Sequence, residues 1–382
     1  MRRRTLRRWL SGLLAAVMMV TLLPVTALAV EKPTSGADYD WVQEKIKEIQ
    51  KIDPLHPYTV NGPYRIESSD LYQYTLQNTY TDETGHSGTD TIILILPGEN
   101  ASNTVLPNYK NAEDEEIPWM KSRPSRVYFS AGVTGIGNYA FADNPNLQQV
   151  IFQNASTLQK IGDSVFYNDD MAAFQDESGS GALNLSNVKE MGIAAFYNCD
   201  RLTGVTLSGD LNGGSIPERA FSSCNGLTSI TIPDGIRTIG REAFSGCTRA
   251  GSINLPDSLV TIGESAFACS IDSPNRQLTQ LTIPQNVVTI EKEAFYGYKA
   301  MTTVTVESTV LQKPGDAAFG NSALSAYSGP QQMEDGQIIP DAGTVFKTPN
   351  NEIAKLFENL VNCYTGPISP LRLIEEESYP AT

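Results

Sequence analysis

The stretch TIPDGIRTIGREAFSGC at residues 231–247 decides the fold, because close copies of it follow in the same chain. NLPDSLVTIGESAFAC occupies residues 254–269, and TIPQNVVTIEKEAFYGY occupies residues 282–298. One unit that recurs every 20 to 50 residues is typical of a solenoid, in which each unit forms one coil that stacks on the next. We call each such coil a rung.

The phenylalanine near the end of each copy marks the length of the repeat. Its intervals along the chain are 25, 30, 25, 23, 23, 28 and 24 residues. The two long intervals contain residues 167–182 and 270–277, which we expect to form loops outside the stack. The marker residues are Phe141, Phe166, Phe196, Phe221, Phe244, Phe267, Phe295 and Phe319.

A short strand is predicted after each phenylalanine. In Leu227-x-x-Ile230-x-Ile232, for example, apolar residues alternate with polar ones, which indicates a strand with one buried face. Pro233, which has no N–H to donate, ends that strand. One rung cannot bury its apolar face alone, so neighbouring rungs stack, with parallel strands about 4.8 Å apart.

The repeat I-P-x-x-V-x-x-I-G-x-x-A-F-x-x-C-x-x-L-x-x-I-x-I-P resembles the BspA-like leucine-rich repeats of bacterial surface proteins. The resemblance covers residues 127–319 in eight copies, with Pro217 and Glu291 in place of the usual glycine and Pro314 in the last copy. It implies an α/β solenoid, that is, a curved leucine-rich-repeat stack with parallel strands. It also implies an extracellular role in adhesion or recognition, without catalytic residues.

Residues 1–29 are predicted to be a secretory signal peptide. Arginines at the start precede the apolar run Leu10 to Val25, and Ala27-Leu28-Ala29 offers the small residues that a signal peptidase accepts. A membrane anchor is the alternative, although the run is short for a membrane span. We therefore expect a protein that is secreted or associated with the cell surface, with no membrane insertion after cleavage.

The segments on either side of the repeats are predicted to cap the solenoid. Residues 30–126 contain an expected helix at Asp40 to Ile52 and an expected strand at Ile92 to Leu96, so we interpret them as an N-terminal cap or a small α+β subdomain. A separate binding domain is the alternative. In residues 320–382, Asn351 to Asn362 has the apolar spacing of a C-terminal cap helix, and a flexible tail is expected from Tyr364 onward.

Charge and cysteine positions narrow the possible partners. Without residues 1–29 the chain has 23 Lys and Arg against 43 Asp and Glu, a balance that repels nucleic acid. We expect a monomer. Four cysteines recur with the repeat, which favours one buried packing position over disulfides between rungs or a zinc site. They are Cys199, Cys224, Cys247 and Cys269.

The sequence offers little for catalysis. The chain has two histidines, His56 and His86, and both stand in turn-like polar stretches. Hydrolase, metalloprotease and phosphate-binding motifs are missing. Acidic pairs such as Asp169-Asp170 are typical of solvated loops. We predict that the protein is not an enzyme and that it uses no cofactor and no metal. An enzyme within residues 31–126 is the least favoured alternative.

The polar residues between the buried positions of each strand form a candidate ligand-binding surface. They must point away from the core, because successive side chains of a strand alternate between its faces. An array of hydroxyl and amide groups suits an extracellular protein or glycan, although threonine is also simply common on solvated strands. The main hypothesis is protein–protein or cell-surface binding, and the alternative is a structural spacer module of a cell-envelope assembly. The candidate residues are Gln149, Thr206, Ser229, Thr231, Asn254, Gln280, Thr282, Thr303 and Thr305.

Overall fold

The computed structural model describes most of the chain between residues 32 and 320. The described residues are 32–52, 57–81, 87–111, 116–169, 173–176, 183–270, 272–320, 345–347 and 356. The expected signal peptide lies outside them. Of the expected C-terminal helix only Leu356 is described; it is helical and packs, partly buried, against the core.

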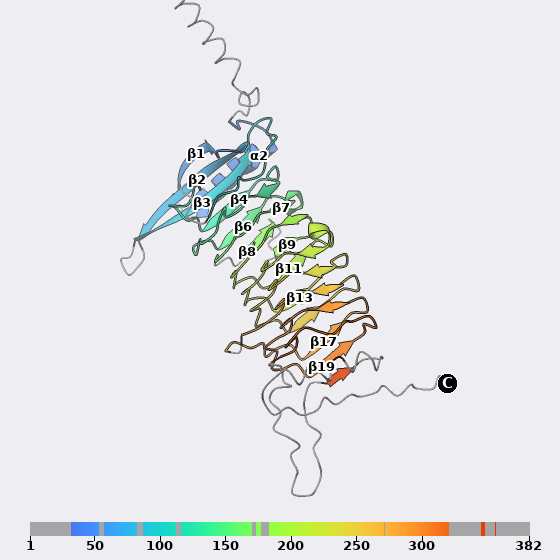
Figure 1. Ribbon diagram of the computed structural model, residues 1–382. Coiled ribbons are helices and arrows are strands. Elements are labelled where there is room, and N and C mark those ends of the chain that lie inside the picture. The colour runs from blue at the N-terminus through green and yellow to red at the C-terminus, as the bar shows by residue number, and fades with distance from the viewer. Residues whose placement is uncertain are drawn as a thin grey trace, which may run out of the picture.

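Among the described residues, a helix and three strands come first and lead directly into the solenoid (Figure 1). Helix α2 (Ala37–Ile52) is followed by strands β1 (Thr59–Arg65), β2 (Leu71–Thr81) and β3 (Ser87–Pro97). β2 pairs antiparallel with β1 and β3, and β3 then pairs in parallel with β4 (Arg126–Phe129), the first solenoid strand. The expected helix and strand of this region are therefore present.

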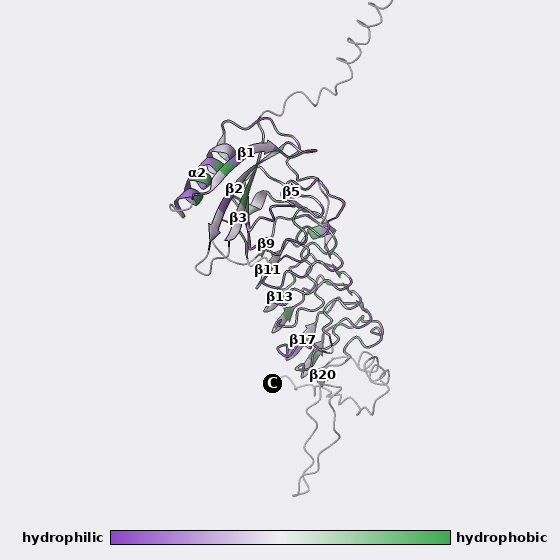
Figure 2. Cartoon of the chain, turned by 90° about the vertical axis from the view of Figure 1, so that its left-hand side faces the viewer, coloured by the Kyte–Doolittle hydropathy of each residue, from purple (hydrophilic) through white to green (hydrophobic). Residues whose placement is uncertain are grey.

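Helix α2 covers one face of this N-terminal sheet. Its buried residues Val42, Ile46 and Ile49 form a cluster with side chains of β2 and β3, such as Tyr74 and Leu94. Figure 2 shows the helix lying beside these strands. The opposite face of β3 belongs to the core of the repeats, so the N-terminal region and the solenoid share one sheet.

The repeats form a stack of parallel strands with a second, shorter ladder of strands beside it. The first ladder forms the strand face; the second consists of two-residue strands that contain the apolar residue five positions before each phenylalanine. The strand face continues with β6 (Gln149–Phe152), β8 (Ala173–Asp176), β9 (Leu183–Leu185), β11 (Val205–Leu207), β13 (Ser229–Thr231), β15 (Ser252–Asn254), β17 (Gln280–Ile283), β19 (Thr303–Val306) and β20 (Val345–Lys347). The second ladder comprises β5 (Gly135–Ile136), β7 (Lys160–Ile161), β10 (Glu190–Met191), β12 (Ser215–Ile216), β14 (Thr238–Ile239), β16 (Thr261–Ile262) and β18 (Thr289–Ile290).

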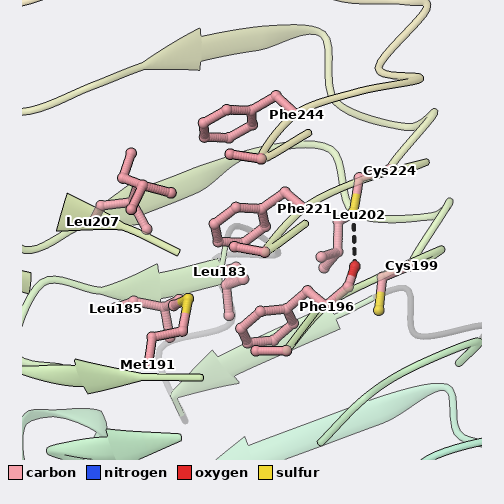
Figure 3. Packing of buried hydrophobic residues seen from close by; sticks show 14 of the residues in the cluster. Leu183, Leu185, Met191, Phe196, Cys199, Leu202, Leu207, Phe221, Cys224 and Phe244 are labelled. Carbon is pink, nitrogen blue, oxygen red and sulfur yellow. Dashed lines mark hydrogen bonds between the residues drawn. The ribbon is translucent and has the colours of Figure 1, made fainter. Parts of the chain in front are cut away.

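The marker phenylalanines form a continuous stack along the core (Figure 3). From Phe141 to Phe319, neighbouring ring centroids lie 5.1–5.7 Å apart, with rings close to parallel. Trp119 extends this stack by one ring, 4.8 Å from Phe141. Leu106 lies beside β5 and its N–H donates to the carbonyl of Gly135. One more coil, without the repeat motif, therefore precedes residue 127.

Turns, rather than helices, connect the second ladder to the strand face. Two positions before each marker phenylalanine, a non-glycine residue has a positive φ, for example 54° at Glu242. The N–H of Glu242 donates to the carbonyl of Glu264 on the next rung, and the N–H of Phe244 donates to that of Ala266. Because backbone groups bond between rungs, no helix is needed to satisfy them.

The predicted fold class, a leucine-rich-repeat solenoid of parallel strands, is confirmed. The expectation that residues 167–182 form only a loop is wrong, because Ala173–Asp176 is strand β8 and pairs in parallel with β6. The backbone groups of β6 thereby find partners on its outer edge. The segment 270–277 is also not wholly outside the stack, because Asn275 is fully buried. No helix in the part of the chain that the structure describes is long and apolar enough to cross a membrane.

The four cysteines that recur with the repeat occupy the core as free thiols. Cys199, Cys224 and Cys247 each donate a hydrogen bond to the carbonyl of the preceding rung's phenylalanine, at Sγ···O distances of 3.0–3.4 Å. Burial raises the pKa of Cys224 to about 12, so its thiol stays protonated. Cys269 is also buried but does not share this position, because its Sγ lies 3.8 Å from the carbonyl of its own rung's Phe267. The reason is that Cys269 stands two residues after its phenylalanine instead of three. On the next rung Tyr298 holds the equivalent position, and its Oη donates to the carbonyl of Phe267 at 2.9 Å.

Candidate functional site

The structure places the nine candidate residues along the strand face. Strand pairing brings several of them side by side: Thr231 pairs with Asn254, Gln280 with Thr303, and Thr282 with Thr305. Their degree of exposure differs. Gln149, Thr303 and Thr305 are partly exposed, whereas the exposed ones are Thr206, Ser229, Thr231, Asn254, Gln280 and Thr282.

The N-terminal end of this face is covered. Trp41 of α2 lies 6.5 Å from Tyr128 of β4, measured between ring centroids. Ile151, which neighbours Tyr128 on β6, is only 8% exposed. The polar, open part of the face therefore begins beyond β6.

A shallow hollow of ≈ 410 Å³ lies at the N-terminal end of the solenoid, beside β5 of the second ladder. It includes Glu67, Asn103 and Lys160. None of the nine candidate residues lines it.

A second hollow, of ≈ 390 Å³, lies within the open part of the strand face, between β15 and β17. It brings together three of the candidate residues, Asn254, Gln280 and Thr282. It also includes Ser252 and Thr279, which the candidate set did not contain. Ser252 could have been found from the sequence, since it stands two positions before Asn254 on the same face. We call this hollow the strand-face depression.

The backbone ladder of the strand face is interrupted at the depression. β13 pairs with β15, and β17 pairs with β19, but among the described strands none bridges β15 and β17 by a backbone ladder, as is also the case between β11 and β13. The interval from Phe267 to Phe295, which contains β17, has 28 residues, five more than the interval before it. Side-chain hydroxyl and amide groups therefore surround the open space, which suits hydrogen bonding to a ligand.

Asn275 links the two rungs whose strands line the depression. Its Nδ2 donates to the carbonyl of Ala250 at 2.8 Å, and its Oδ1 accepts from the N–H groups of Gln277 and Leu278. Asn275 is 0% exposed, so these bonds are shielded from water. The side chain thus links the rungs where their strands do not pair.

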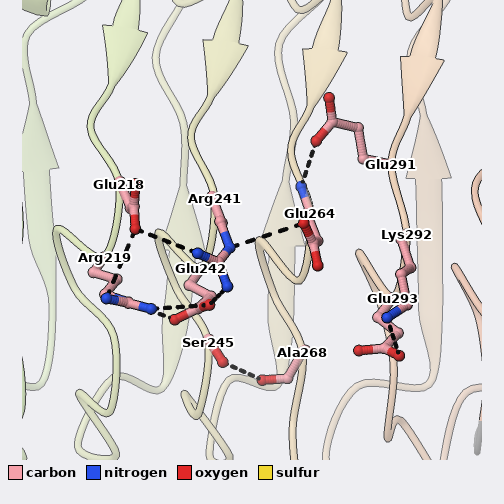
Figure 4. A network of polar contacts seen from close by, with 10 residues as sticks. All are labelled: Glu218, Arg219, Arg241, Glu242, Ser245, Glu264, Ala268, Glu291, Lys292 and Glu293. Atoms are coloured by element: carbon pink, nitrogen blue, oxygen red, sulfur yellow. Dashed lines mark hydrogen bonds and ion pairs between the residues drawn. The ribbon is translucent and has the colours of Figure 1, made fainter.

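The turns that follow the strands of the second ladder carry a different surface, made of paired charges (Figure 4). Arg219 Nε lies 2.6 Å from Glu242 Oε2, and Arg241 Nη2 lies 2.8 Å from Glu242 Oε1. The carboxylate lies between two guanidinium groups, and these neighbours lower the pKa of Glu242. Because these side chains are partly exposed, water screens their attraction, and each pair contributes little to stability, about 0–1 kcal/mol.

The described residues give no sign of catalytic chemistry. No group of three or more His, Cys, Asp and Glu side chains within them is arranged to hold a metal ion. His56 and His86 lie outside the described residues. Tyr58, whose pKa burial and Asp90 raise to about 12, belongs to a polar cluster with Arg126 that joins β3 to β4. That cluster is structural, because it holds the first solenoid strand against the N-terminal sheet.

Comparison with known proteins supports a leucine-rich-repeat assignment. The sequence model of the BspA type leucine-rich repeat region matches in six copies, over residues 120–213, 170–275 and 273–337. A search of the curated proteins found no match.

Solved structures with a similar chain path are distant in sequence. A leucine-rich repeat protein from Bacteroides ovatus is 16% identical, with a TM-score of 0.42, over 68% of this chain and 66% of that one, so this chain spans just under two thirds of its length. One from Eubacterium ventriosum is 17% identical, with a TM-score of 0.31, over 72% and 98%. A leucine rich cell surface protein from Faecalibacterium prausnitzii is 15% identical, with a TM-score of 0.26, over 80% and 100%.

Proposed function

Because this chain belongs to the BspA-type leucine-rich repeat family, we propose that it is a non-catalytic recognition protein that binds another macromolecule through its strand face. The family fits a binding or recognition role. In the proposal, the chain is exported by the signal peptide expected at residues 1–29, and acts as a monomer outside the cell or at its surface.

The observation that carries the proposal is the strand-face depression with its exposed polar residues. Asn254, Gln280 and Thr282 converge there, and Ser229 and Thr231 continue the same surface on β13. Hydroxyl and amide groups both donate and accept hydrogen bonds, so they can pair with the peptide groups of an extended ligand. Stacked rungs repeat the same groups along the solenoid axis, which gives an extended surface rather than a single pocket.

The proposed partner is an extracellular protein or a glycan. The residues that line the depression include no aromatic side chain, so the proposed contacts are hydrogen bonds rather than stacking on a sugar ring or an aromatic anchor of a protein interface. Nucleic acid is disfavoured, because the whole chain has a formal net charge of −15 at pH 7 and phosphate groups are repelled.

The proposal can be tested by blocking the depression. Purified chain from residue 30 onward is assayed against a panel of extracellular-matrix proteins, mucins, purified glycans and bacterial cells. Thr231→Trp, Asn254→Trp and Thr282→Trp each place a large side chain, which strands accommodate well, on the proposed contact surface. We expect saturable binding to at least one panel member and its loss in these variants.

Matched controls place the same side chain elsewhere. Gln159 and Thr309 are exposed and lie away from the depression, so Gln159→Trp and Thr309→Trp are expected to bind like the parent chain. Binding that survives all three blocking variants would refute the strand face as the contact surface. No binding to any panel member, together with retention of the chain in the cell wall, would favour the structural spacer.

A further inference from the structure

Three cationic residues stand beside the strand-face depression, at the end where its strands begin. Arg249 precedes β15, Arg276 precedes β17, and Lys299 precedes β19. Asn275 forms a parallel bridge with Tyr298, and both are fully buried, so the residues that follow them, Arg276 and Lys299, are neighbours on the outside. We call these three residues the basic corner.

Arg249 also lies at this end of the strands, beside the segment that contains Arg276. Ala250 is buried and accepts the hydrogen bond of Asn275, so Arg249 adjoins the segment of Arg276. Arg249 and Arg276 are exposed, and Lys299 is partly exposed. Because Arg249, Arg276 and Lys299 belong to three successive rungs, they follow one another along the solenoid axis.

The basic corner differs from the other cations of this part of the solenoid. Arg219, Arg241 and Lys292 each pair with a glutamate within the network of Figure 4. In contrast, no described carboxylate lies within ion-pair distance of the side chains of Arg249, Arg276 or Lys299. Asp272, which is exposed in the segment that leads to Arg276, is the acidic residue nearest to the three cations in sequence, so the corner keeps a net positive charge in a chain with a net charge of −15.

The two ends of the strand face therefore differ in charge. Where the strands end, the exposed residues include Asp234, Asp257 and Glu307, together with the cation Arg237. The depression lies between this end and the basic corner, so a ligand with negative groups is attracted toward the corner and not toward the opposite end.

We propose that the basic corner and the strand-face depression together bind an extended acidic peptide segment of a partner protein. Its carboxylates lie on Arg249, Arg276 and Lys299, and its peptide groups bond to the amides of Asn254 and Gln280. This inference rests on the proposed function and adds the chemistry of the partner. Arginine suits the role because its guanidinium group pairs with a carboxylate through two hydrogen bonds.

A labelled synthetic peptide of alternating Glu and Thr serves as the probe, and a peptide of the same length with Gln in place of Glu is its neutral control. Binding is followed by fluorescence anisotropy at low and at physiological ionic strength. We expect saturable one-to-one binding of the Glu peptide at both ionic strengths. The neutral peptide should bind at least about tenfold more weakly, equivalent to roughly 1.4 kcal/mol.

Variants locate the binding site. The triple variant Arg249→Gln, Arg276→Gln and Lys299→Gln is expected to weaken the Glu peptide by at least about tenfold and to reduce the dependence of its Kd on salt. Arg237→Gln, at the opposite end of the face, removes one positive charge and is expected to leave binding unchanged. Thermal unfolding of each variant shows whether it is folded. Arg→Gln and Lys→Gln changes at the surface should leave the folded state intact.

Equal binding of both peptides would overturn the inference, and so would unchanged binding of the Glu peptide to the triple variant. Heparin binding through the basic corner without peptide binding would also overturn it, because it would indicate an acidic glycan as the partner.

The panel assay distinguishes failure of the acidic-peptide inference from failure of the proposed function. If a panel partner is lost with Asn254→Trp but bound normally by the triple variant, the strand face still binds and only the acidic-peptide inference fails. If the tryptophan variants have no effect on any panel partner, the proposed function fails.

Discussion

Asn275 Nδ2 donates a hydrogen bond of 2.8 Å to the carbonyl oxygen of Ala250, a residue of the preceding rung. The bond joins the segments that precede β15 and β17, two strands that do not pair with each other. A single buried side chain thus links two rungs whose strands share no backbone ladder.

Replacing Asn275 should destabilise the solenoid at this junction. Asn275→Ala leaves the carbonyl of Ala250 and the N–H groups of Gln277 and Leu278 without their partner, at a cost of about 3 kcal/mol in unfolding free energy. Asn286→Ala is the matched control, because the side chain of Asn286 donates to the carbonyl of Asp257 at an exposed position. Denaturant unfolding compares the two. Equal stabilities would contradict a linking role for Asn275.

The phenylalanine stack should be the most sensitive part of the core. Phe244 lies 5.4 Å from both Phe221 and Phe267, measured between ring centroids, and is fully buried. Phe244→Ala is expected to cost about 3–5 kcal/mol, because a ring-sized cavity remains. Phe244→Leu keeps most of the volume and should cost about 1.5 kcal/mol. Hydrogen exchange of the Phe244→Ala variant shows whether the protection of backbone amides falls first in the rungs next to Phe244. A uniform loss of protection along the chain would argue against stability that depends mainly on contacts between neighbouring rungs.

The stability of the solenoid should depend on pH through Asp169. The expectation that Asp169 is solvated is wrong, because the residue is 1% exposed. Burial raises its pKa well above the usual value, against the lowering effect of the hydrogen bond from Asn144 N–H, with Asp143 adding to the rise and Arg123 opposing it. The folded state therefore keeps a proton that the unfolded state releases from about pH 4 upward. As pH rises through this window, the unfolding free energy falls.

The variant Asp169→Asn removes this titration. Its amide oxygen can still accept the hydrogen bond that Asn144 N–H donates to Asp169 Oδ1. We expect the variant to be more stable than the parent chain at neutral pH and to lose that advantage as the solution is acidified toward pH 4. Denaturant unfolding across this range makes the comparison. Parallel pH profiles for the two chains would show that Asp169 does not titrate in the expected direction.

The core thiols should be inert until the chain unfolds. Burial raises the pKa of Cys224 to about 12 and that of Cys269 to about 11, and a thiol must lose its proton to react. We expect iodoacetamide to leave these two and the equally buried Cys199 and Cys247 unlabelled at pH 8 in the native protein, and to label all four in denaturant. Peptide mapping by mass spectrometry reports each thiol separately. Native labelling of Cys224 would show that its rung opens.

The regular part of the fold follows from local patterns. Phe221, Phe244 and Phe267 stand at equal intervals of 23 residues, so each rung repeats the same inward position and the rings must stack. The strand face is predictable for the same reason, because Ser229 and Thr231 alternate with a buried isoleucine. Two-residue strands such as β14 were too short to be recognised as strands, although their buried isoleucines were found.

The irregular part could not be predicted, because it depends on contacts between distant residues. Trp119 has no repeat motif around it, yet its ring lies on Phe141 and its Nε1 donates to the carbonyl of Ala140. Asn212 lies in a Gly-rich segment, yet its side chain exchanges two hydrogen bonds with the backbone of Met191. A polar residue in an insertion gives no local signal that it will turn toward the core.

The sequence by itself determined the repeat, the residues that face the core, the parallel strands and the family, because each rung carries the same pattern and stacking is the way to bury its apolar face. Only the tertiary structure decided where the strand face is covered by α2 and where it is open. It also decided that Asn254, Gln280 and Thr282 surround one depression, next to Arg249, Arg276 and Lys299. The physical reason is that these residues come from different rungs, so they meet only when the rungs are stacked.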